Sequence, residues 1–206
     1  MAVTPNYSWP VPVDTDYVKD GAEAIKDLGD AIDSTVFGLP SGALTLVSAT
    51  TITTSNTVTV DNVFTSTYRN YKIILTSTGQ VGTGEPQFQL RAGGVTTAGS
   101  GYNYSTTGSA SNGAGTAGAV PSASNWGLGY TITPLGIFAS EMTLYNPQIA
   151  TETMFSSRST SSVTATNSYN YAIGGMHTAT TAHDGLIITN SGGNFSGVLR
   201  VYGLQD

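Results

Sequence analysis

Two histidines and a neighbouring aspartate are the side chains with the clearest metal-binding chemistry. His177 and His183 are the only histidines in the chain, and Asp184 directly follows the second one. Zinc sites in proteins use three or four such ligands, and no further ligand stands at a matching spacing. Nor are the two histidines separated by the four positions that place a pair on one helix face. We therefore expect ordinary loop histidines, no bound metal and no cofactor.

Serine and carboxylate side chains do not form the patterns of hydrolytic enzymes. Serines are abundant, but the sequence contains no G-x-S-x-G motif that would expose a nucleophile. Glycoside hydrolysis needs two carboxylates held at a fixed separation across the sugar. No pairing is evident among the acids beyond the N-terminal region, which are Asp61, Glu85, Glu141, Glu152, Asp184 and Asp206. We expect a protein that is not an enzyme.

Aromatic rings beside hydroxyl and amide side chains suit carbohydrate binding. Rings stack on the apolar faces of sugars, while Ser, Thr and Asn offer hydrogen bonds without charge. Residues 105–127 form a stretch of small residues that we expect to be a long loop. Four aromatic residues in or near this stretch are candidate receptor-binding residues: Tyr102, Tyr104, Trp126 and Tyr130. The alternative is that these rings belong to the core or to a sheet face.

Length and composition indicate one β domain with an attachment segment. Of the 206 residues, 39% are apolar and only 10% are charged, and the chain contains no cysteine. Disordered chains combine low hydrophobicity with high net charge, so this composition favours a folded domain. The net charge of −6, without a basic stripe, argues against a nucleic-acid partner. We expect no secretory signal and no membrane insertion, because neither pattern is evident.

The first thirteen residues, MAVTPNYSWPVPV, contain three prolines. Proline fixes φ and disfavours helix in the residue before it, so we expect an extended arm over residues 1–13. Aromatic residues commonly anchor interfaces, which makes four residues of this arm candidate attachment residues: Tyr7, Trp9, Pro10 and Val11. The arm would dock on another subunit or protein, or else fold back onto its own domain.

Residues 14–36 predict a single amphipathic helix with seven of the thirteen acids of the chain. Asp14, Thr15 or Asp16 can cap its start. The apolar residues Val18, Ile25, Leu28 and Ile32 follow a heptad pattern with an imperfect second row. A stripe this narrow is marginal for an isolated helix, so we expect a coiled-coil seam, with a trimer favoured. The alternative is a helix that lies on its own β domain.

Residues 37–43 predict a hinge, and residues 44–206 predict the β domain. The hinge contains two glycines and a proline. Short runs rich in Tyr, Ile, Val and Thr follow, separated by Gly, Asn and Ser. Eight or more such strands with no helix between them predict an antiparallel β-sandwich of jelly-roll type.

Several motifs resemble the N-terminal regions of bacteriophage tail-fibre and minor tail proteins. The opening residues 6–12, NYSWPVP, and residues 15–22, TDYVKDGA, carry this resemblance, which continues in residues 28–33, LGDAID. The body is similar to phage β domains in style, through residues 68–71, YRNY, and residues 192–197, GGNFSG.

The resemblance implies a virion protein whose arm and helix attach a trimer to tail or baseplate proteins. Its β domain would then face outward and bind a host-surface glycan through several weak sites per particle. The chain has neither a long shaft nor a large depolymerase domain, so the resemblance implies a short tail fibre. A capsid decoration or head-fibre protein with a mainly structural role is the alternative, and an unrelated bacterial β-sandwich adhesin is a third reading.

Overall fold

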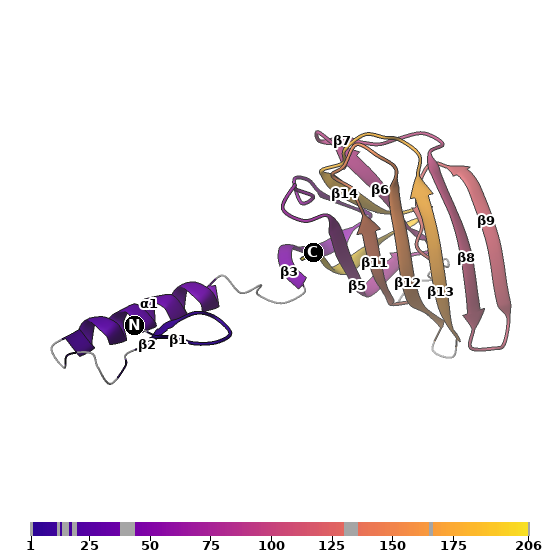
Figure 1. Ribbon diagram of the computed structural model, residues 1–206. Coiled ribbons are helices and arrows are strands. Elements are labelled where there is room, and N and C mark those ends of the chain that lie inside the picture. The colour runs from indigo at the N-terminus through magenta and orange to yellow at the C-terminus, as the bar shows by residue number, and fades with distance from the viewer. Residues whose placement is uncertain are drawn as a thin grey trace. The chain divides into compact units, whose positions relative to one another are not determined.

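The computed structural model describes residues 2–11, 13, 17, 20–37, 44–129, 136–164 and 167–205. The chain divides into two compact units, Met1–Ser41 and Gly42–Asp206. The described residues are mainly β, with antiparallel sheets and one helix, and this confirms the predicted fold class at that level (Figure 1).

The N-terminal unit consists of a small hairpin and a helix. β1 (Ala2–Val3) pairs antiparallel with β2 (Pro10–Val11). The helix α1 spans Gly21–Phe37, and Nε1 of Trp9 donates a hydrogen bond to Oγ1 of Thr35, 2.9 Å away. The first residues are therefore folded against the helix of their own unit rather than extended.

A tight turn causes this difference from the expected extended arm. The backbone N–H of Ser8 donates to the carbonyl of Thr4 at 3.0 Å, and Ser8 adopts a positive φ of 56°. Proline fixes its own φ but does not prevent the residues after it from turning. The chain therefore reverses between the two short strands.

The helix begins later than the sequence predicts. Tyr17 has no helical structure, and α1 begins at Gly21, directly after Asp20. The expected capping residues 14–16 and the heptad residue Val18 lie outside the described residues. Most of the expected hinge, residues 38–43, lies outside them too.

The second unit contains two antiparallel sheets. The large sheet has the order β3-β15-β5-β11-β12-β13-β8-β9. Its strands are β3 (Leu44–Ser55), β5 (Asn70–Gly82), β8 (Tyr102–Ala110), β9 (Gly115–Ala123), β11 (Phe138–Tyr145), β12 (Thr153–Thr164), β13 (Asn167–His177) and β15 (Gly193–Leu204). The small sheet has the order β10-β6-β14-β4, with β7 also paired to β6. Its strands are β4 (Thr57–Val60), β6 (Pro86–Ala92), β7 (Val95–Thr96), β10 (Trp126–Gly127) and β14 (Gly185–Asn190).

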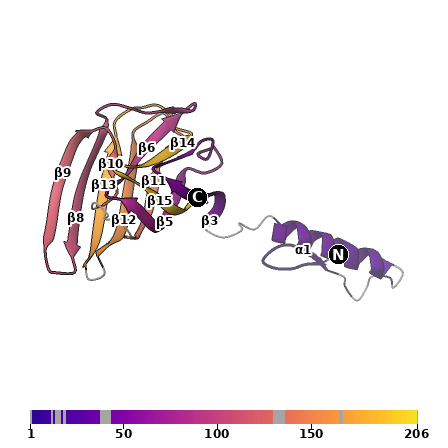
Figure 2. The same ribbon diagram turned by 180° about the vertical axis from the view of Figure 1, so that it is seen from behind.

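Four strand pairs nest inside one another along the chain. The outermost pair is β3 with β15, followed inward by β4 with β14, β5 with β11 and β6 with β10. The pairings of β15 with β5 and of β14 with β6 join these pairs into the two sheets. Two further hairpins, β8–β9 and β12–β13, extend the large sheet beyond β11. In Figure 1 and Figure 2, β9 forms the outer edge of this extension.

Both sheets contribute side chains to one hydrophobic core. Trp126 of β10 lies at its centre, with its ring centroid 4.2 Å from that of Phe155 on β12. The same indole is stacked with Phe88 of β6 at 5.7 Å and makes an edge contact with Tyr102 of β8 at 5.0 Å. Aromatic burial of this kind gives a large hydrophobic stabilisation, and it ties β8 and β12 of the large sheet to β6 and β10 of the small one.

The predicted long loop at residues 105–127 is wrong. These residues form most of the β8–β9 hairpin and end in β10. Every residue of β9 except the last is exposed, so neither face of this strand needs apolar side chains. The period-two pattern that reveals a half-buried strand is therefore missing, and pairing with β8 holds β9 in place instead.

Candidate functional site

Three adjoining hollows lie on the outer face of the large sheet, the face turned away from the core. The central hollow has a volume of about 470 Å³. A hollow of about 530 Å³ lies at one end, and we call it the polar hollow because most of its residues are Ser, Thr, Asn or Arg. An apolar hollow of about 630 Å³ lies at the other end. Thr107, Arg158 and Ala172 line both the central and the polar hollow. Ser105, Ser156 and Gly174 line both the central and the apolar hollow. We call the three together the outer groove.

Small residues on β13 form the floor of the outer groove. Ala172 pairs with Arg158 of β12 on one side and with Thr107 of β8 on the other. Gly174, two residues along, points to the same outer face because side chains alternate along a strand. At these two positions β13 has almost no side chain, while the neighbouring strands carry longer ones, so a trough is left between them.

Uncharged hydroxyl groups dominate the walls of the central hollow. They come from β8, β11 and β12, and the residues are Ser105, Thr107, Thr143 and Ser156. Hydroxyls both donate and accept hydrogen bonds and rotate to suit a partner. The central hollow thus matches a ligand that is itself rich in hydroxyl groups.

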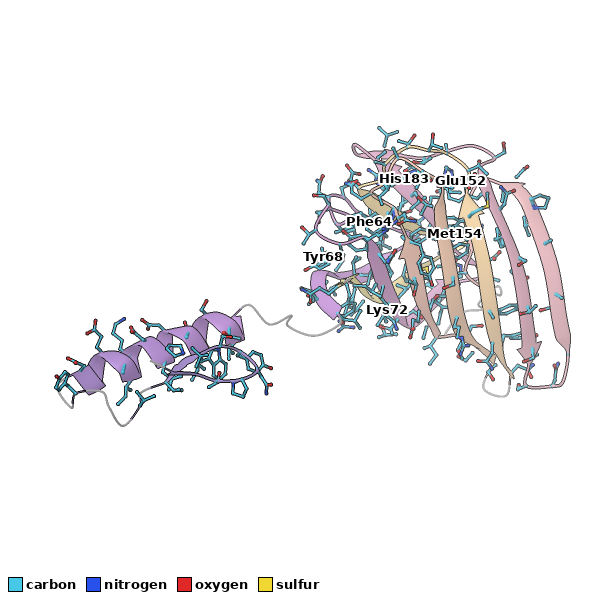
Figure 3. The ribbon with its side chains drawn as sticks, viewed as in Figure 1. Phe64, Tyr68, Lys72, Glu152, Met154 and His183 are labelled. Atoms are coloured by element: carbon cyan, nitrogen blue, oxygen red, sulfur yellow. The ribbon has the colours of Figure 1, made fainter. Side chains whose placement is uncertain are left out.

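Larger side chains gather in the apolar hollow. Met154 is 55% exposed and Tyr145 is 40% exposed, and the two residues are register partners on β12 and β11. Met176 of β13 and Val120 of β9 complete this end. Figure 3 draws these side chains and labels Met154. A ring and a thioether on an exposed surface offer a platform for the apolar face of a sugar.

This part of the sheet carries three charged residues, of which Lys72 and Glu141 form an ion pair with each other. Glu141 of β11 is the register partner of Arg158, yet its carboxylate is 2.5 Å from Nζ of Lys72 on β5. Among the described residues, none forms an ion pair or a side-chain hydrogen bond with the guanidinium of Arg158. The groove therefore contains one unpaired cation beside its hydroxyl groups.

Two of the four predicted receptor-binding residues lie in the core. Tyr102 and Trp126 are fully buried, and the hydroxyl of Tyr102 bonds the backbone at Leu90 and Thr97. Rings without exposed surface cannot stack on a sugar, so this burial is at odds with receptor contact. Tyrosine occurs on both the buried and the exposed faces of strands, so the period-two apolar pattern does not tell which face a given tyrosine occupies.

The other two predicted receptor-binding residues differ in position. Tyr104 is half-buried and packs against the core, but it also lines the apolar hollow. Burial is the largest cause that raises the pKa of the Tyr104 hydroxyl, and the nearby Glu85 adds to it. Tyr130 lies outside the described residues.

The histidine pair is buried rather than placed on an exposed loop. His177 and His183 have ring centroids 5.5 Å apart, and both are nearly inaccessible to solvent. Burial lowers the pKa of His183 to about 4, and the neighbouring His177 adds to this effect. Among the described residues, no group of three His, Asp or Glu side chains could hold a metal ion. His177 also packs against Tyr102 of the core, with ring centroids 4.3 Å apart.

Two acids of the β domain, Asp61 and Asp184, accept hydrogen bonds that hold neighbouring loops and strands in place. Asp61 accepts a hydrogen bond from Nε of Arg91 at 2.6 Å, and Asp184 accepts from the backbone N–H of Gly93. Burial raises the pKa of Glu85. Glu152 is exposed, and Asp206 lies outside the described residues.

The candidate attachment residues lie in the N-terminal unit. The rings of Tyr7 and Trp9 are stacked at 5.0 Å, and Tyr7 remains 59% exposed. Pro10 and Val11 form β2 and are half-buried.

The heptad residues occupy one helix with unequal exposure. Ile25 is 67% exposed, whereas Leu28 and Ile32 are half-buried. A large apolar side chain that is two-thirds exposed on a helix gains from burial against a partner.

The chain matches no protein-family model, no curated protein and no solved structure. The part of the chain that the structure describes contains no helix long and apolar enough to cross a membrane.

Proposed function

We propose that this chain is a bacteriophage virion protein, a short trimeric tail fibre that carries no enzymatic activity. Its N-terminal unit attaches to tail or baseplate proteins, and its β domain binds a glycan on the host surface. The observation that carries this proposal is the contrast between the two units. The N-terminal unit has no fully buried side chain among its described residues, whereas the β domain has a large core.

A unit of this size without a core cannot be stable by itself. It contains a helix of 17 residues, and isolated helices of about that length are marginal in water. Burial of the exposed Ile25 and Tyr7 against other chains would supply the missing stabilisation. A three-stranded coiled coil through Ile25, Leu28 and Ile32, with the hairpin docked on the virion, meets this need.

The β domain in this proposal is a jelly-roll sandwich with two inserted hairpins. A jelly roll is formed by nested antiparallel pairing of eight strands in two sheets. The same nested pairing joins eight strands of this domain: β3, β4, β5, β6, β10, β11, β14 and β15. Viral capsid and lectin domains use this architecture, which agrees with both virion assembly and carbohydrate binding.

The outer groove supports the glycan part of the proposal. It combines hydroxyl-lined walls with an apolar platform at one end. Sites for small ligands place a few polar groups among apolar surface in this manner. Weak binding by one groove becomes tight attachment when several grooves on a particle act together.

Adsorption competition tests the proposed function. Purified full-length protein and residues 42–206 are added separately to candidate host cells before the phage. We expect both to reduce adsorption and the full-length protein to act at a concentration about a hundredfold lower, because only it is oligomeric.

Two outcomes contradict the fibre proposal. If neither protein reduces adsorption and gold-labelled antibody marks the capsid, the chain is a head protein rather than a tail fibre. If both proteins act at the same molar concentration, binding does not depend on a trimer.

A further inference from the structure

We propose that the outer groove binds a polysaccharide whose repeating unit carries an anionic group, and that Arg158 binds this group. The inference rests on the proposed function and adds the chemical class of the glycan. The shared chemistry is a carboxylate or a phosphate on a hydroxyl-rich polymer.

The large sheet has the opposite charge balance to the rest of the chain. Its eight strands contain three cationic residues, Lys72, Arg158 and Arg200, and one acidic residue, Glu141. The whole chain has a net charge of −6. The three cations alternate with buried neighbours along their strands and so point to the outer face. A sheet face on which cationic residues outnumber acidic ones attracts an anion, even in a protein that is acidic as a whole.

Glu141 does not neutralise Arg158, although the two are register partners. Its carboxylate is engaged by Lys72 on the other side, at 2.5 Å. The guanidinium thus keeps its charge and its five N–H donors available among the hydroxyl groups of the groove. Arginine binds carboxylate and phosphate with two parallel hydrogen bonds, which gives both strength and orientation.

The position of Arg158 favours a polymer over a small anion. Arg158 lines both the central and the polar hollow, so the trough continues on either side of it. Between Met154 and Thr160 the groove extends for roughly 20 Å, at about 3.3 Å per strand residue. A chain lying in it presents its anionic group to Arg158, hydroxyls to Ser105 and Thr107, and an apolar ring face to Met154.

Binding of defined polymers to the full-length protein tests this assignment. The probes are polygalacturonate, which carries carboxylates, poly(glycerol phosphate), which carries phosphates, and neutral dextran of similar length. Isothermal titration calorimetry at low and high salt measures the affinity of each. We expect at least one anionic polymer to bind about tenfold or more tightly than dextran, and salt to weaken this binding.

Arg158→Gln is the decisive variant, and Arg200→Gln is its matched control. Both remove one positive charge from the outer face, but Arg200 is on β15, three strands away from β12, and does not line the groove. We expect about a tenfold loss of affinity for Arg158→Gln and less than a twofold change for Arg200→Gln. An equal loss of affinity in both variants would mean that the polymer is attracted to the positive charge of the face in general, and it would overturn the inference.

A steric variant provides a second test that leaves every charge in place. Gly174 has open space above it, since the nearest atom to a Cβ there is a backbone oxygen 4.0 Å away. Gly174→Tyr therefore fills the trough without disturbing the core, and we expect it to abolish binding of the anionic polymer. Unchanged binding places the polymer elsewhere on the protein and overturns the inference.

Failure of this inference and failure of the proposed function give different results. If full-length protein blocks phage adsorption and both groove variants block it equally well, the fibre function stands and the groove assignment falls. If the anionic polymer binds in the groove but the protein never blocks adsorption, the groove assignment stands and the fibre function falls. Equal affinity for dextran and both anionic polymers overturns the role of Arg158.

Discussion

Adjacent glycines in β13 face opposite environments, because side chains alternate along a strand. A Cβ on Gly174 would have only one atom within 4.0 Å, a backbone oxygen of Phe155. A Cβ on Gly175 would overlap the carbonyl oxygen of Asn103 and lie 2.7 Å from Cβ of Tyr104. Backbone atoms of a paired strand cannot move aside cheaply, so β8 can approach β13 this closely only at a glycine.

Alanine substitutions at these two glycines should change stability in opposite directions. We expect Gly175→Ala to lower the free energy of unfolding by about 2 kcal/mol through overpacking. Gly174→Ala should raise it by about 0.5 kcal/mol, because alanine loses less backbone entropy in a strand than glycine does. Urea denaturation monitored by tryptophan fluorescence measures both. Similar effects at the two positions would contradict the alternation described for β13.

The buried His183 should make the β domain sensitive to mild acid. Burial lowers the pKa of His183 from 6.5 to about 4, with a further contribution from His177. The unfolded chain therefore binds a proton between pH 6.5 and 4 that the folded chain does not, and the free energy of unfolding decreases as the pH falls. We expect a loss of about 3 kcal/mol from this residue between pH 7 and 4, and none above pH 7.

His183→Phe isolates this effect because it keeps a ring in the core without a titrating group. Stability measured by urea denaturation from pH 7.5 to 4 should fall more steeply in the natural protein than in the variant. Groups distant from His183 titrate alike in both proteins and cancel in the difference, whereas His177, whose ring centroid is 5.5 Å away, contributes to the difference together with His183. Parallel profiles would show that protonation of His183 does not oppose folding.

At the scale of elements, a strand can be predicted from the sequence when apolar and polar residues alternate along it. The sequence predicts strands at residues 71–75, 88–90 and 142–145, and these runs lie within β5, β6 and β11, where each strand points apolar side chains into the core. β12 has no such pattern, since its inner face carries the buried serines 157, 159 and 161. Two of these serines bond Ser140 of β11 at 3.0 and 2.9 Å, so hydroxyl pairing replaces apolar packing there.

The outer groove could not be predicted from the sequence for a related reason. Its central residues Thr107, Arg158 and Ala172 are neighbours only through the register of β8, β13 and β12. Register depends on the whole sheet and not on any local run of residues. The sequence suggested carbohydrate chemistry from its hydroxyl and aromatic content. Of the four rings that it named, Tyr102 and Trp126 lie in the core, and Tyr104 lines the apolar hollow.

The helix α1 offers the sharpest test of oligomerisation. Ile25 is the most exposed of the described heptad residues, so a charge there acts mainly on contacts with other chains. If the proposed trimer forms through this helix, we expect Ile25→Asp to convert it to monomers in light scattering coupled to size-exclusion chromatography. Ala22→Asp is the control, because Ala22 is also exposed on α1 but lies outside the heptad stripe and adds the same charge. A trimer that survives Ile25→Asp would remove the helix from the interface.

At the scale of the whole molecule, the two units should differ in independent stability. Residues 42–206 contain the core and all strands of both sheets, whereas the described residues of the N-terminal unit bury no side chain fully. We expect residues 42–206 alone to unfold cooperatively within about 2 °C of the main calorimetric transition of the full-length protein, because the core is intact. A peptide of residues 1–41 should show little helix by circular dichroism at micromolar concentration, because a short helix with no buried core against it is marginal in water. Helicity that rises with peptide concentration would support self-association through α1. A helix that is full and independent of concentration would instead mean that the hairpin suffices to stabilise it, and the need for a partner would disappear.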